Sequence, residues 1–119
     1  MVETIGKITI APGVLVTIVR FAVLKQLGVA RLSSREPSRP GPRLRGRAAT
    51  APGVGVWVRD GRVTVEVRVV ADGSVNAHEL GTTVQQGVTQ AIEEMVGMPV
   101  EAVHVYIDDV DVNGIREGR

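Results

Sequence analysis

The stretch from Gly73 to Val112 constrains the fold most, because several independent signals in it predict a capped helix followed by a strand. Asn76 is typical of a helix N-cap, and Glu79 three residues later completes a capping box. Gly97 suits the left-handed residue that follows a helix, and Pro99 prevents its continuation. The apolar residues in between recur at three- and four-residue steps and give the predicted helix one apolar face: Leu80, Val84, Val88, Ala91, Ile92 and Met95.

Three stretches of alternating residues predict strands. Val54 to Arg59 and Arg62 to Val70 flank Asp60-Gly61, a dipeptide that favours the tight type I′ turn of a β-hairpin. Residues 103–108 alternate in the same way after the predicted helix. Because aromatic residues make up only 3% of the chain, we expect the inward faces of these strands to form a valine-rich core.

The N-terminal part of the chain predicts a strand at Gly6–Ile10, then a helix that begins at Pro12 and ends by Gly28. This helix is apolar nearly all round, since a second apolar stripe lies where a solvated helix carries polar residues. Such a helix is either sandwiched within the monomer or buried against another subunit. In so small a domain we favour a subunit interface, formed by Val16, Val19 and Val23.

Residues 31–50 change composition to arginine, proline, serine and glycine, which predicts an exposed loop. Six arginines and one glutamate give residues 31–47 a charge of +5, and since the chain carries +1 the remainder sums to −4. We expect the loop to bind an anionic membrane surface or an acidic partner through Arg35, Arg39, Arg43, Arg45 and Arg47.

The predicted elements follow one another as β-α-β-β-α-β over a single domain of 119 residues. This order predicts an α+β two-layer sandwich, with two helices on one face of a four-stranded, mostly antiparallel sheet. The second face of the sheet is expected to stay open and to present Trp57, His104 and Tyr106.

No residue pattern in the chain predicts catalysis, a cofactor, a metal site or a small-molecule substrate. The chain has no cysteine, and its two histidines, His78 and His104, lie on different predicted elements. Asp109 to Gly114 reproduces the first half of a calcium loop, but no entering helix precedes it, so an acidic strand end is the better interpretation. The first residues do not form a signal peptide, and we expect a cytoplasmic protein that is not an enzyme.

With the elements in place, six short motifs can be compared with known families: Gly6-Lys7-Ile8-Thr9-Ile10-Ala11-Pro12-Gly13-Val14, Gly28-Val29, Asp60-Gly61, Val84-Gln85-Gln86-Gly87-Val88, Glu94-Met95-Val96-Gly97-Met98-Pro99-Val100 and Val103-His104-Val105-Tyr106-Ile107-Asp108-Asp109-Val110. In the order and spacing of these motifs the chain resembles the alkaline shock protein family of bacterial envelope-stress proteins over nearly its whole length. The resemblance implies a non-enzymatic cytoplasmic protein that self-associates and in some members gathers at the inner face of the membrane through a membrane-anchored partner. Members commonly carry a Tyr-Gly pair where this chain has Ala71-Asp72-Gly73, and their loop is poorer in arginine.

Single-stranded RNA binding is the alternative function. Trp57 and Tyr106 on an open sheet face are suited to stacking unpaired bases, and the arginine loop to contacting phosphates. The Gly-aromatic motif of RNA-binding sheets is absent from Arg62 to Val70, and the remainder of the chain is acidic. We therefore favour the scaffold function over RNA binding.

Overall fold

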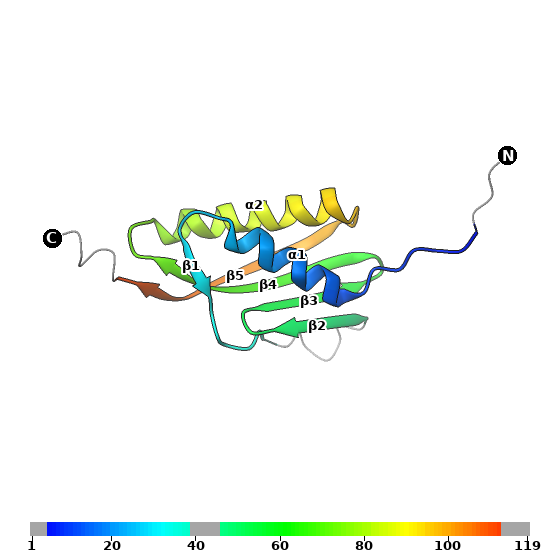
Figure 1. Cartoon of the computed structure of the whole chain (residues 1–119), viewed down its shortest axis with the longest axis horizontal. Helices are drawn as coiled ribbons and strands as arrows, with labels where there is room; N and C mark the ends of the chain where they lie inside the picture. Colours follow the sequence, from blue (N-terminus) through cyan, green and yellow to red (C-terminus); the bar gives the residue numbers. More distant parts are fainter. Residues whose placement is uncertain (1–4, 39–45, 113–119) are drawn as a thin grey trace.

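The computed structural model describes residues 5–38 and 46–112, in which two helices cover one face of a five-stranded sheet (Figure 1). This arrangement confirms the predicted α+β class. In chain order the elements are α1 (Pro12–Leu24), β1 (Val29–Leu32), β2 (Arg47–Ala51), β3 (Val54–Arg59), β4 (Arg62–Asp72), α2 (Ala77–Met95) and β5 (Val100–Asp111).

Strand β4 organises the sheet, because three other strands pair with it. β5 lies parallel to β4 along one edge, where Val63 pairs with Val100 and Asp72 with Asp111. β3 and β1 are antiparallel to β4 and share its other edge, since β3 pairs with residues 62–67 and β1 with residues 69–71. β2 extends the sheet beyond β3. The sheet is therefore mostly antiparallel, as predicted.

The strand predicted at Gly6–Ile10 is wrong. This segment has no regular secondary structure and pairs with no strand in the described part of the chain. Instead the chain turns at Gly28, whose φ is +99°, and the next residues form β1 against β4. β1 and β2 both overlap the range predicted as a loop, so residues 31–32 and 47–50 of that range belong to strands.

The core consists of valines from β3 and β4 packed against both helices. α1 and α2 lie side by side and run antiparallel over this face (Figure 1). The predicted ends of α2 are confirmed, since Asn76 Oδ1 accepts from the Glu79 N–H at 2.9 Å and Gly97 is left-handed with φ +78°. Of the predicted apolar face, Leu80, Val84, Val88 and Ile92 are buried, whereas Met95 is 65% exposed. No helix in the described ranges is long and apolar enough to cross a membrane.

Candidate interaction surfaces

The three valines assigned to a subunit interface belong to the core of the chain itself. Val19 and Val23 are completely buried and Val16 nearly so, among side chains of the sheet and α2. This corrects the prediction that Val16, Val19 and Val23 contact a partner. The helix is rotated about its axis relative to that prediction, because Leu15 and Ala22 join the valines on the buried side.

The rotation leaves a different apolar stripe of α1 exposed. Phe21 is 66% exposed, Val14 and Leu24 are about half exposed, and all three recur at helical spacing. Arg20 and Lys25 lie beside them, and Lys25 Nζ is 5.9 Å from the centre of the Phe21 ring. The polar residues of the helix are exposed on the same side. Their positions in the sequence could therefore have located the exposed face. We call Val14, Phe21 and Leu24 the α1 stripe.

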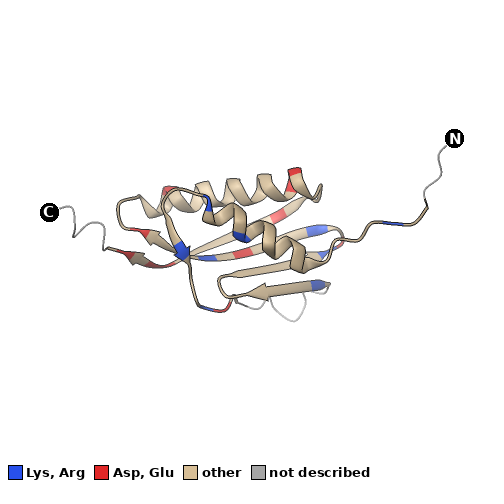
Figure 2. Ribbon diagram, in the orientation of Figure 1, with Lys and Arg blue, Asp and Glu red and all other residues tan. Residues whose placement is uncertain are grey.

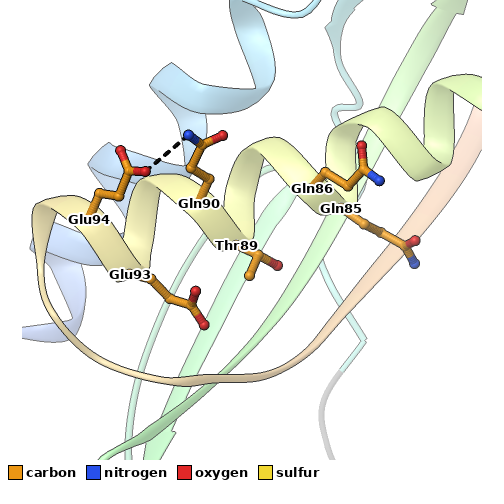
Figure 3. Close-up of a pocket in the computed structure, with 6 residues that line it drawn as sticks. All are labelled: Gln85, Gln86, Thr89, Gln90, Glu93 and Glu94. Carbon is orange, nitrogen blue, oxygen red and sulfur yellow. Dashed lines mark hydrogen bonds between the residues drawn. The ribbon is translucent and has the colours of Figure 1, made fainter.

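The outward side of α2 differs from that of α1 in both polarity and charge. Its exposed residues are mostly glutamine, threonine and glutamate, and the helix contains no lysine or arginine. Figure 3 shows six of these residues, which line a shallow hollow of about 460 Å³. Gln85 Nε2 donates to the Val103 carbonyl at 3.1 Å and Gln90 Nε2 to Glu94 at 3.0 Å, while Glu93 points away from Glu94. The hollow is a polar surface without a paired acid and base.

The second face of the sheet is not fully open, because residues 33–38 cross it. Glu66 and Arg68 on β4 hold this segment: Glu66 Oε2 accepts from the Ser38 N–H at 2.7 Å, and Arg68 Nη2 donates to Ser38 Oγ at 2.9 Å. Arg68 also donates to Glu66 and Asp108, each at 2.9 Å. We call Ser38, Glu66, Arg68 and Asp108 the sheet-face network. It corrects the prediction that this face stays open.

The sheet-face network keeps a guanidinium charged in a nearly buried position. Burial by itself would lower the pKa of Arg68, but the hydrogen bond to Glu66 and the charges of Asp108 and Glu66 outweigh burial and raise that pKa. The second carboxylate oxygen of Asp108 is buried and has no hydrogen-bond partner in the described structure. The charged side chains of the network therefore pair with one another, Arg68 with Glu66 and Asp108.

The rings of Trp57 and Tyr106 on this face contact other residues of the same chain. The Arg68 guanidinium lies 4.2 Å from the centre of the Tyr106 ring, and Trp57 extends over Gly55, where an added Cβ would overlap its ring. Pro37 is buried and lines a hollow together with Trp57. His104 is exposed. Trp57 is on β3 and Tyr106 on β5, so the intervening β4 separates the two proposed stacking residues.

Only two of the five arginines proposed to bind an anionic surface lie within the described residues. Arg35 is largely exposed and 3.9 Å from Asp108, at the edge of the sheet-face network. Arg47 is exposed at the start of β2. Arg39, Arg43 and Arg45 lie outside the described residues, and the role of the arginines stays a prediction.

The described residues contain no group of three or more histidine, aspartate or glutamate side chains arranged to hold a metal ion. His78 is exposed in the first turn of α2, and His104 is exposed on β5. Of the residues in the half calcium loop, Asn113 and Gly114 lie outside the described residues. Asp109 binds its own strand, since its Oδ1 accepts from the Val110 N–H at 2.8 Å.

The described surface thus consists of faces suited to contact with other molecules. The fold places the protein in the class of small α+β proteins with helices on one side of a sheet. The sequence profile of the alkaline shock protein 23 family, which has a cell envelope-related function, matches residues 1–112. The chain therefore belongs to this family, as the resemblance predicted. No curated protein and no solved structure matches it.

Proposed function

We propose that this protein is a non-enzymatic cytoplasmic scaffold of the cell envelope that self-associates through its helix layer. The observation that carries the proposal is the α1 stripe, since an aromatic residue that is 66% exposed between two cations is suited to a protein interface. The envelope-related function of the family supports the setting of this role at the inner face of the membrane.

The distribution of charge supports a second copy of the chain as the occupant of the α1 stripe. α1 and its C-cap carry Arg20 and Lys25 and no acidic residue, whereas α2 carries Glu79, Glu93 and Glu94 and no lysine or arginine (Figure 2). Because the helices lie side by side, a two-fold axis parallel to them places α1 of each copy on α2 of the other. Basic helices then face acidic helices twice, which favours this arrangement over α1 against α1.

The proposal predicts that Phe21→Glu separates the copies without unfolding them. Loss of a central aromatic contact and the added charge should weaken association about 30-fold or more, whereas an exposed substitution leaves stability within about 0.5 kcal/mol. Light scattering coupled to size-exclusion chromatography measures the mass, and urea unfolding measures the stability.

His104→Glu is the matched control, because it makes a similar charge change on the opposite face of the sheet. It should keep the mass of the wild type. If Phe21→Glu keeps that mass as well, the helix layer is not the interface. A wild type that is monomeric alone but binds anionic vesicles or a membrane-anchored protein would replace self-association with one of those partners.

The structure offers no specific support for single-stranded RNA binding. Tyr106 is covered on one side by Arg68, and Trp57 lies beside the crossing segment 33–38. RNA binding remains an untested alternative, which a saturating change in Trp57 fluorescence on addition of oligonucleotides would support.

A further inference from the structure

A second candidate surface lies at the end of the molecule where α2 finishes. Residues 7–10, the hairpin residue Gly61 and residues 96–99 surround a cleft of about 860 Å³ there. Its apolar lining includes Ile8, which is 91% exposed although it belongs to an alternating segment typical of a strand. We call this the end cleft.

The charged side chains that line the end cleft are all positive. Lys7 and Arg47 are among its lining residues, and none of the described residues that line it is acidic. A cleft with apolar walls and a cationic rim fits an extended segment that alternates apolar with acidic side chains.

The opposite end of the same chain presents such a segment. The last three residues of β5 and the residue after them are Asp109-Val110-Asp111-Val112, whose two valines are 43% and 46% exposed. Asp111 pairs with the last residue of β4, so Val112 lies beyond the sheet. In Figure 1 this end of β5 projects from the left of the molecule, whereas the residues of the end cleft lie at the right. The acidic residues near this end of β5 are red in Figure 2.

We infer that the tip of β5, residues 109–112, binds in the end cleft of a second copy. The period of two along a strand puts Val110 and Val112 on one side, toward the apolar walls, and directs the carboxylates toward the cationic rim. The contact joins different surfaces at opposite ends of the molecule, so it is heterologous and adds copies in a row. It deepens the proposed self-association but does not use the helix layer.

Charge reversal tests the contact, and Asp109 is the position of choice because Asp111 also lies 3.5 Å from Arg31 of its own chain. Arg47→Asp and Asp109→Arg should each weaken the association of dimers into larger species about tenfold, as measured by sedimentation velocity. An equimolar mixture of the two variants should regain larger species, because the reversed tip of one matches the reversed cleft of the other. Single variants that associate like the wild type, or a mixture that regains nothing, would overturn the inference.

A peptide separates this inference from the proposed function. A fluorescent peptide with the sequence of residues 107–112 should bind the intact Phe21→Glu protein, whose helix layer is disabled, and should bind Arg47→Asp about tenfold more weakly. A peptide with the same residues in scrambled order is the control. If the peptide binds Phe21→Glu but the wild type forms no dimer through the helix layer, the end contact is supported and the helix-layer interface is ruled out. No saturable anisotropy change at millimolar protein would overturn the end contact whatever the mass of the wild type.

Discussion

At the scale of single residues, the arrangement least visible in the sequence is the sheet-face network. Alternation along β4 predicts that Glu66 and Arg68 share a face, but it does not predict that segment 33–38 folds over them. That cover depends on hydrogen bonds between residues about thirty positions apart, and sequence patterns of short range carry no signal for them.

The network should make Arg68 important for stability. Arg68→Ala removes hydrogen bonds to three residues and leaves the buried Glu66 without its charged partner, so it should cost about 2–4 kcal/mol of unfolding free energy. Arg62→Ala, at the exposed start of the same strand, is the control and should change stability by no more than about 0.5 kcal/mol. Equal effects of the two substitutions in urea unfolding would mean that the network contributes nothing.

Two glycines should respond to alanine in opposite directions. Gly81 lies inside α2, and apart from its chain neighbours and the nearby helix backbone no atom lies within 4 Å of an added Cβ, so Gly81→Ala should stabilise the protein by about 0.5–1 kcal/mol. At Gly55 the added Cβ would overlap the Trp57 ring and lie 3.0 Å from Pro37, so Gly55→Ala should cost about 1–3 kcal/mol. It should also change Trp57 fluorescence in the folded state. A Gly55→Ala protein of wild-type stability and spectrum would contradict this packing.

At the scale of elements, signals that are local in the sequence predicted the structure best. The ends of α2, its apolar period except for Met95, and the Asp60-Gly61 hairpin depend on neighbouring residues and are confirmed. β1 and β2 were missed because they are short and lie in arginine- and proline-rich sequence, and only pairing with β4 and β3 makes them strands. The chain approaches α2 closely at Gly87, since an added Cβ there would overlap the Gln26 side chain.

The rotation of α1 shows why a surface is harder to predict than an element. A helix with two apolar stripes satisfies the hydrophobic pattern with either stripe inward, and only packing against the sheet decides between them. The structure buries the stripe with Val19 and exposes the one with Phe21. α1 is therefore apolar on two sides, as expected, but the side that is free for contact carries Phe21 and not Val19.

At the scale of the whole molecule, the surfaces proposed for contact lie in three places. The helix layer carries a basic apolar helix beside an acidic polar one, and the two ends carry a cationic cleft and an acidic tip (Figures 1 and 2). A two-fold contact through the layer closes on itself, whereas an end-to-end contact does not. Together they predict dimers that join into longer assemblies, which fits a scaffold in an envelope-related family.

The mass of the wild-type protein in solution tests the central claim most directly. Sedimentation velocity from micromolar to millimolar protein at low salt should show monomer passing to dimer and then to larger species. Added salt should weaken association, because both proposed contacts join opposite charges. A single species of about 12.7 kDa, the mass of one chain, over the whole concentration range would contradict self-association.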